Sequence, residues 1–471
     1  MEEIIGRKRE IEILESCVNS GSPEFIAIYG RRRVGKTFLV KNFFDNKFDF
    51  YMTGSYGGNR QDHLRNFKLQ MKLYSGKNIP VPKDWLDAFF ALNEYLTGLK
   101  KDIVTVFIDE LPWLDTPKSN FIRALELFWN QWASNIPNLK LIVCGSATTW
   151  MTNKLLGDKG GLHNRVTRSI HLSPFNLAET EEYLQWRGVN WDRYTIVEAY
   201  MIFGGIPYYL KMIDKKYGLP GNVDFLLFQK DSELSKEYDI LFHSLFSDAE
   251  MYKDVVNLLS GKMKGMTRKE IVEALPKSNG GTLTEVLRNL VNCDFISTYS
   301  PFGKSDRETL YQLSDHYCLF YNKYVRHYNG RNAEYWSSAI DSSSRRAWAG
   351  YAFEQVCLGH VQQIKKALGI NGVQTDVCSW TGGTSTEKTQ IDLLLDRRDH
   401  IINICEMKFY NTKFEITKEY AEKLRNRKEL FRKATKTNKA LHITLVTTYG
   451  LVDGIHASTV QNVVTMDDLF N

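Results

Sequence analysis

Cysteine pairs and long apolar runs are both missing from this sequence of 471 residues. Its seven cysteines include no CxxC pair, and most lie in apolar runs, as Cys144 does, so buried free thiols in a reducing compartment are favoured over disulfides or a zinc site. No apolar run approaches the ~18 residues of a membrane span, and the first ten residues are too charged for a signal peptide. We therefore expect a soluble, cytoplasmic protein that has no membrane partner.

A large excess of charge of one sign is missing too. Lys and Arg number 61 and Asp and Glu 55, so the net charge is +6, which disfavours a uniformly basic nucleic-acid coat protein. The motifs HExxH, GxSxG and GxGxxG are absent, which disfavours zinc hydrolysis, serine hydrolysis and dinucleotide binding. The composition is that of an ordinary globular protein, with length for about three domains.

Short apolar runs alternate with amphipathic stretches in residues 1–175. Phe25–Tyr29, Val104–Asp109 and Leu141–Cys144 are apolar on both faces, which is typical of buried strands in a parallel sheet. Helical patterns such as Phe121–Trp132 lie between them. This region therefore predicts an α/β fold.

A glycine-rich loop follows the first of these strands and precedes a helical pattern. It matches GxxxxGK[ST] in full, through Gly30, Arg31, Arg32, Arg33, Val34, Gly35, Lys36 and Thr37. Glycines let backbone N–H groups point at phosphate oxygens, Lys36 can reach the β and γ phosphates, and the Thr37 hydroxyl can bind Mg²⁺. We expect a nucleotide phosphate site here; the alternative is a basic turn that matches by chance.

Two further strand ends carry polar residues. Asp109 ends the second apolar run, where it can hold Mg²⁺, and Glu110 can polarise the attacking water. Ser146 follows the third run and could sense the γ-phosphate. The alternatives are an acidic pair that faces solvent and a simple strand-to-loop turn.

The string IYGRRRVGKT resembles an archaeal and bacterial ATPase family of the AAA+/STAND group, whose members often carry a C-terminal DUF234 domain. Gly6 and Arg7 resemble its N-terminal box near the adenine, Arg165 matches an arginine before its Pro-Phe segment, and Gly204–Pro207 matches a GGxP turn at the start of its helical lid. The resemblance implies a P-loop NTPase core in residues 1–175, a helical lid in 176–245, and bound ATP. Gly6, Arg7 and Pro207 would then line the nucleotide.

Arg165 could act on the γ-phosphate in cis or from a neighbouring subunit, because an arginine there neutralises charge in the transition state. A trans contact would imply a homo-oligomer. The alternative is a surface arginine paired with a local carboxylate.

Residues 246–320 predict three short helices and a hairpin, the arrangement of a winged helix-turn-helix, and 321–345 reads as a connector. Major-groove DNA binding is one interpretation. The candidate recognition helix has Arg288 as its one basic residue, beside Glu285, so a spacer or oligomerisation element is favoured.

Two strands joined by a charged turn, Gln390–Asp396 and Ile401–Phe409, predict a hairpin in which Asp392 lies opposite residues near Glu406. Lys408 is two residues after Glu406 and shares its face of the strand. Two carboxylates suit Mg²⁺ or Mn²⁺, and a lysine can orient or deprotonate a water that the metal activates.

This arrangement resembles the PD-(D/E)xK nuclease superfamily. The resemblance implies a restriction-endonuclease-like α/β domain in residues 346–471, with Asp392, Glu406 and Lys408 as its site and Glu354 as a further metal ligand. The alternative is an inactive fold that is kept for binding.

Residues 411–440 hold ten Lys or Arg and four Glu, a surplus of six that equals the net charge of the whole chain. A solvated helix face is one interpretation, and contact with a phosphodiester backbone is the other. We expect an ATPase coupled to a metal-dependent, nuclease-like domain that acts on or binds DNA. The alternative is a nucleotide-dependent switch that binds DNA or protein without nuclease turnover.

Overall fold

The computed structural model describes residues 3–157, 162, 164–246, 248–276, 280–340, 342–383 and 388–471. The chain forms two compact units, Met1–Ser173 and Pro174–Asn471. Within the described ranges, no helix is both long and apolar enough to cross a membrane. All seven cysteines carry free thiols, and six of them are buried.

The first unit is built on a five-stranded, wholly parallel sheet with the order β2-β3-β4-β1-β5. Its strands are β1 (Glu24–Tyr29), β2 (Phe50–Thr53), β3 (Val104–Asp109), β4 (Leu139–Gly145) and β5 (Arg168–His171). The three strands predicted from apolar runs are the three inner ones, which are covered on both faces. The edge strands are four residues long: β2 buries only Phe50 and Met52, and β5 is exposed at three of its four residues, so neither gives a run that is apolar on both faces.

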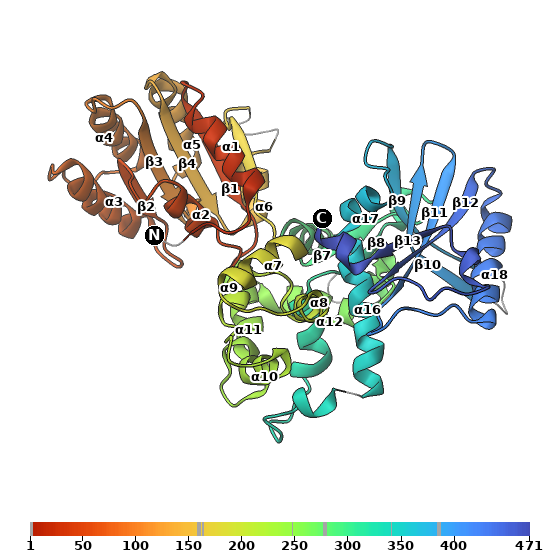
Figure 1. The fold of residues 1–471 in the computed structure, drawn as a ribbon. Helices are drawn as coiled ribbons and strands as arrows, with labels where there is room; N and C mark the ends of the chain where they lie inside the picture. The colour runs from red at the N-terminus through yellow and green to blue at the C-terminus, as the bar shows by residue number, and fades with distance from the viewer. Residues whose placement is uncertain are drawn as a thin grey trace. The chain divides into compact units, whose positions relative to one another are not determined.

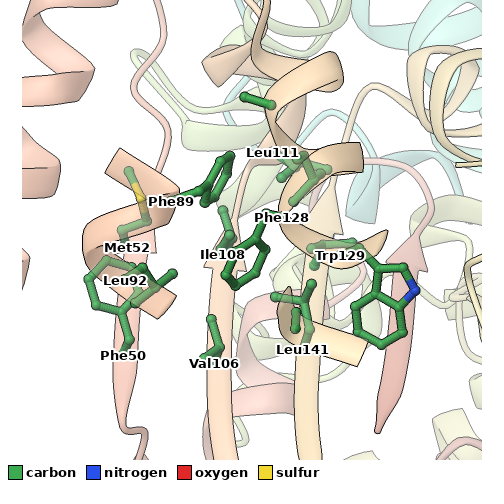
Figure 2. Close-up of a cluster of buried hydrophobic side chains, with 14 of the residues drawn as sticks. Phe50, Met52, Phe89, Leu92, Val106, Ile108, Leu111, Phe128, Trp129 and Leu141 are labelled. Atoms are coloured by element: carbon green, nitrogen blue, oxygen red, sulfur yellow. The ribbon is translucent and has the colours of Figure 1, made fainter. Parts of the chain in front are cut away.

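Helices cover this sheet (Figure 1), and residues of three of them join the strands in its main hydrophobic core. The helices of this unit are α1 (Lys8–Val18), α2 (Lys36–Phe43), α3 (Arg60–Ser75), α4 (Trp85–Thr97), α5 (Phe121–Leu127) and α6 (Thr148–Trp150). In Figure 2, Phe89 and Leu92 of α4 pack toward Phe50 of β2 and Ile108 of β3. The predicted helix 121–132 is present, but it continues past α5 as a π-helical turn. This apolar layer fixes the strands whose ends carry the candidate nucleotide site.

The second unit begins with a helical segment, as predicted. Its helices are α7 (Leu177–Trp186), α8 (Arg193–Phe203), α9 (Pro207–Lys211), α10 (Leu219–Val223) and α11 (Glu233–Leu245). The Gly204–Pro207 turn joins α8 to α9, so it lies inside this segment and not at its start. Gly205 has φ 64°, and a Cβ there would lie 2.1 Å from the backbone oxygen of Phe175, so only glycine fits.

The middle of this unit has the predicted three helices and hairpin. These are α12 (Ala249–Ser260), α13 (Arg268–Ala274) and α14 (Gly281–Asn292), with a sheet of order β6-β8-β7 made by β6 (Met266–Thr267), β7 (Ile296–Tyr299) and β8 (Leu310–Leu313). The backbone N–H of Phe302 donates to Ser379 O at 2.7 Å, which ties this module to the sheet that follows.

The C-terminal part holds a second five-stranded sheet, in the order β13-β12-β11-β10-β9. Its elements are α15 (His316–Phe320), α16 (Ser343–Gly359), α17 (Val361–Ala367), β9 (Thr375–Gly383), β10 (Lys388–Arg397), β11 (Ile401–Lys408), α18 (Lys418–Thr435), β12 (Ala440–Thr447) and β13 (Asn462–Thr465). Strands β9, β10 and β11 are antiparallel, whereas β11, β12 and β13 run parallel. The result is a mixed α/β sheet domain that contains the predicted hairpin.

Candidate functional sites

The glycine-rich loop leaves β1 and enters α2 with the backbone shape that the motif predicts. Gly30 and Gly35 have φ values of 146° and 94°, and Arg33 has φ 76°. A Cβ on Gly30 would lie 2.3 Å from the backbone oxygen of Leu172, so a side chain cannot be accommodated. The loop therefore curls tightly at the N-terminus of α2, where backbone N–H groups and the helix dipole favour an anion.

Lys36 is the first residue of α2 and is buried. Its Nζ donates to Gly30 O at 2.8 Å and to Arg31 O at 2.9 Å. The ammonium therefore lies within the curl of the loop, the position from which it can reach bound phosphates.

Thr37 and Asp109 meet across the end of the sheet. Thr37 Oγ1 donates to Asp109 Oδ2 at 2.8 Å. Burial raises the pKa of Asp109, whereas the hydrogen bond from Thr37 acts to lower it. A hydroxyl and a carboxylate oxygen at this separation are ligands that suit Mg²⁺, so the residues present fit that ion.

Glu110 follows Asp109 with φ 46° and is held by Ser146. The Ser146 hydroxyl donates to Glu110 Oε2 at 2.8 Å, and its backbone N–H donates to the same oxygen at 3.2 Å. Sequence reasoning placed both residues at strand ends but missed this contact. Ser146 thus orients the Glu110 carboxylate, and its role as a γ-phosphate sensor stays a prediction.

The remaining predicted nucleotide residues lie in different places. Arg7 is buried, and its guanidinium donates to Val34 O at 3.2 Å, so the N-terminal Gly6-Arg7 box touches the glycine-rich loop. Arg165 is exposed, between β4 and β5. Pro207 begins α9, in the second unit. The roles of Arg165 and Pro207 stay predictions.

The C-terminal hairpin pairs β10 with β11 from Asp396 opposite Ile402 to Leu393 opposite Cys405, so Asp392 and Glu406 lie just beyond its last paired residues. The charge of Glu406 acts on Asp392, so the two carboxyl groups lie near each other. Lys408 Nζ lies 2.9 Å from Glu406 Oε1, which confirms that these two residues share a face.

Glu406 has two further partners, both from α18. Tyr420 donates its hydroxyl to Glu406 Oε1 at 2.6 Å, and Arg427 forms an ion pair with Glu406 Oε2. Burial disfavours the charged carboxylate, but Lys408, Arg427 and Tyr420 outweigh it, and the pKa of Glu406 is lowered. Glu406 is therefore ionised and held at both oxygens.

The other two acids of this region behave differently. Burial and the charge of Glu406 raise the pKa of Asp392, and Gln390 donates a hydrogen bond to it. Burial and the charge of Asp392 raise the pKa of Glu354, on α16, to about 8. Two carboxylates with waters are an adequate set for Mg²⁺. Among the described residues, however, no three His, Cys, Asp or Glu side chains form a group that could hold a metal ion.

Tyr420 and Arg427 are the site residues that sequence reasoning missed. The signal is helical periodicity: Tyr420, Leu424, Arg427 and Phe431 recur at spacings of four, three and four, on one face of α18. Leu424 and Phe431 are buried. A cation in line with buried apolar residues faces the sheet and not solvent, although the charge count had grouped Arg427 with a basic surface.

Comparisons with known proteins find an ATPase family model that matches the N-terminal part of the chain. A family model described as an ATPase domain predominantly from Archaea matches residues 4–213. An uncharacterized protein of Methanocaldococcus jannaschii is 28% identical over 327 residues, which cover 68% of this chain and 68% of that protein. An uncharacterized ATP-binding protein of the same organism is 51% identical over 43 residues, which cover 9% of this chain and 73% of that protein.

Two solved structures are similar at low sequence identity. The Walker-type ATPase of Pyrococcus abyssi has a TM-score of 0.47 and 18% identity, over 68% of this chain and 96% of that one. The ORC2 protein of Aeropyrum pernix has a TM-score of 0.41 and 15% identity, over 72% and 96%. Residues 4–213 are therefore similar to an ATPase domain family found predominantly in Archaea.

Proposed function

We propose that this ATPase domain binds ATP with Mg²⁺ and hydrolyses it, and that hydrolysis is coupled to a metal-dependent, nuclease-like C-terminal domain that acts on or binds DNA. The observation that carries the proposal is the 2.8 Å hydrogen bond between Thr37 and Asp109, beside a buried Lys36 at the N-terminus of α2. It brings the two sequence motifs, 72 residues apart, into contact, which supports the proposal that they form one phosphate and metal site.

Each residue of the nucleotide site has one role in this proposal. Lys36 and the loop N–H groups bind the β and γ phosphates, and Thr37 and Asp109 hold Mg²⁺. Glu110, oriented by Ser146, positions the attacking water. Arg165 neutralises charge on the γ-phosphate, and Gly6, Arg7 and Pro207 line the nucleotide, with residues 176–245 as the lid.

In the C-terminal domain, Asp392 and Glu406 would hold Mg²⁺ or Mn²⁺ together with waters, and Lys408 would orient the attacking water. Glu354 forms no three-acid group with them among the described residues, so it is not included as a ligand. Support comes from the hairpin register, which ends at Leu393 opposite Cys405 beside both acids, and from the 2.9 Å contact of Lys408 with Glu406. A bound metal would supply Lewis acidity and an activated water.

A second candidate is a nucleotide-dependent switch that binds DNA or protein without cleaving a phosphodiester. It is favoured by the partners of Glu406, because Lys408, Tyr420 and Arg427 already engage both oxygens of a carboxylate that a nuclease needs as a metal ligand.

Cleavage assays separate the two candidates. Supercoiled and linear DNA are incubated with the intact chain, ATP, and Mg²⁺ or Mn²⁺, and products are resolved on gels. The first proposal expects cleavage that disappears in Asp392→Ala and persists in Asp376→Ala, an exposed acid of β9 that pairs with Arg398 at 3.2 Å. Binding without cleavage under every condition would reject the nuclease and favour the switch.

A further inference from the structure

We propose that Arg427 is a positioning residue that holds Glu406 in a resting state, and that a phosphodiester group frees Glu406 to bind a divalent metal by pairing with Arg427. This inference rests on the proposed metal site of the C-terminal domain. It adds to that site a residue from α18 and an order of events, with the phosphodiester first and tight metal binding second.

The contacts of Glu406 define the resting state. Tyr420 and Lys408 engage Oε1 at 2.6 and 2.9 Å, and Arg427 engages Oε2. A carboxylate offers about four lone-pair positions, so three are in use. Arg427 contacts Oε2, the oxygen that Tyr420 and Lys408 do not contact. A metal that binds Oε2 therefore has to displace Arg427 or share this oxygen with it.

The ion pair between Arg427 and Glu406 is shielded from water, so Arg427 competes strongly with a metal ion for the Glu406 carboxylate. The side chains of Arg427 and Glu406 are 13% and 12% exposed. Attraction between charges is screened much less at such positions than on an open surface. A divalent cation therefore competes with a strong neighbour, and its affinity in the resting state is reduced.

The packing of α18 fixes where Arg427 points. Phe431, one turn further along the helix, is buried among apolar residues of β9, β10 and β11. Its ring lies 5.2 Å from that of Trp380 on β9. Leu424, one turn before Arg427, is buried too. Arg427 is thus held toward Glu406 on β11 by apolar anchors on both sides.

Arg427 also has the chemistry to accept a phosphodiester. The guanidinium fork pairs with phosphate through two parallel N–H donors. Arg427 Nε is buried and has no hydrogen-bond partner among the described residues, so one donor of the fork is unused in the resting state. The same helix presents Lys423, Arg425 and Lys433 to solvent, a surface that attracts a polyanion toward this region.

The test measures Mn²⁺ affinity of the intact chain by isothermal titration calorimetry, without ATP. Every protein carries Asp109→Asn, so that the nucleotide site does not contribute a metal ligand. We expect Arg427→Gln to tighten Mn²⁺ binding by about tenfold or more, because a close buried charge pair is removed. We expect Asp392→Asn to abolish this binding. The matched control is Arg425→Gln, an exposed arginine of α18 whose guanidinium lies 3.4 Å from the Thr459 hydroxyl, and it should leave the affinity unchanged.

A second arm adds a short DNA duplex as the phosphodiester. DNA should tighten Mn²⁺ binding in the protein with Arg427 and should have a much smaller effect in Arg427→Gln, where no ion pair remains to be broken. A gain in affinity cannot result from misfolding, which would weaken the site. If Arg427→Gln fails to fold, Arg427→Lys keeps the charge with a shorter reach and should give a smaller gain.

The outcomes separate the two proposals. If Mn²⁺ binds in an Asp392-dependent way but Arg427→Gln leaves the affinity equal or weaker, the role of Arg427 is wrong and the metal site stands. The same conclusion follows if DNA tightens binding equally with and without Arg427. If no protein binds Mn²⁺ in an Asp392-dependent way, both proposals fail.

Discussion

Both candidate sites have carboxylates on β-strands of a five-stranded sheet, but these carboxylates differ in whether their partners are neutral or charged. In the first unit, Asp109 accepts a hydrogen bond from a neutral hydroxyl, and Lys36 donates to two carbonyls of its own loop. In the C-terminal domain, Glu406 is already paired with the cations Lys408 and Arg427. One site is arranged to receive charged ligands, and the other satisfies its charges internally.

This difference indicates what each site needs before it can act. Lys36 can exchange its hydrogen bonds to the neutral carbonyl oxygens of Gly30 and Arg31 for stronger ones to an anionic phosphate. Glu406 cannot bind a metal without weakening an ion pair that is sheltered from water. The nucleotide site is therefore preorganised, whereas the C-terminal site needs a partner that changes its ion pairs.

The largest expected effect concerns the preorganised site. Lys36→Ala should lower the rate of phosphate release from ATP by at least about 100-fold, because it removes the charge that stabilises the transferred phosphoryl group. Lys47→Ala is the matched control, since Lys47 is exposed and lies 3.8 Å from Asp45. Equal turnover in Lys36→Ala and the unmodified chain would show that the loop is not catalytic.

The next largest effect concerns how much the carboxylates of Glu406 and Asp109 contribute to the free energy of unfolding. Glu406→Gln leaves Arg427 and Lys408 without their counter-ion, so it should lower the free energy of unfolding by about 3–5 kcal/mol. Asp109→Asn removes the charge of a carboxylate that accepts from two neutral donors, the Thr37 hydroxyl and the Glu110 backbone N–H, and should cost about 1 kcal/mol. Chemical denaturation of both variants measures the contrast. Similar losses would mean that the internal pairing of Glu406 has little energetic weight.

Backbone shape gives a third contrast, between two glycines. Gly30→Ala should destabilise the first unit by about 1–3 kcal/mol, because the new Cβ meets Leu172 O at 2.3 Å and the backbone has φ 146°. Gly350→Ala, on α16, has no atom within 4 Å of the added Cβ and should stabilise by about 0.5–1 kcal/mol. Thermal melts report both changes, and a neutral Gly30→Ala would contradict the tight loop.

The smallest expected effect is the pH dependence of the stability of the second unit. Burial lowers the pKa of His316 from 6.5 to about 4, so the unfolded chain takes up this proton more readily than the folded one. Stability from His316 is full above about pH 6.5 and is lost as the pH falls toward 4. At pH 5 the loss should be about 1–2 kcal/mol, and His316→Leu should remove this part of the pH dependence.

Melting temperatures at pH 7 and pH 5 provide the measurement for His316. His243→Leu is the control, because the His243 side chain is 61% exposed. An equal fall in melting temperature for His316→Leu and the unmodified chain would contradict the assignment.

Local patterns made part of this structure predictable from sequence. The inner strands β1, β3 and β4 are apolar on both faces, and the loop between β1 and α2 has fixed spacing, so each carries its own signal. The hairpin register followed from a short turn, and its last pair, Leu393 opposite Cys405, lies next to Asp392 and Glu406. Each of these features depends on residues that are close in sequence.

Features that depend on packing were not predictable in the same way. Edge strand β5 is exposed at three of its four residues, so it forms because an existing sheet accepts it and not because its residues are apolar. Edge strand β2 buries Phe50 and Met52 but is only four residues long. Arg427 lies 21 residues from Glu406, and their contact depends on how α18 rotates against the sheet. Charge counting placed Arg427 on a basic surface, and only the apolar neighbours Leu424 and Phe431 reveal that it faces inward.

The most direct test of the account is DNA cleavage by the intact chain with Mn²⁺ and ATP, compared among the unmodified chain, Lys36→Ala and Asp392→Ala. Coupling of the two sites predicts cleavage that is abolished by Asp392→Ala and altered several-fold by Lys36→Ala. Cleavage that is unaffected by Lys36→Ala, or that persists in Asp392→Ala, would contradict it.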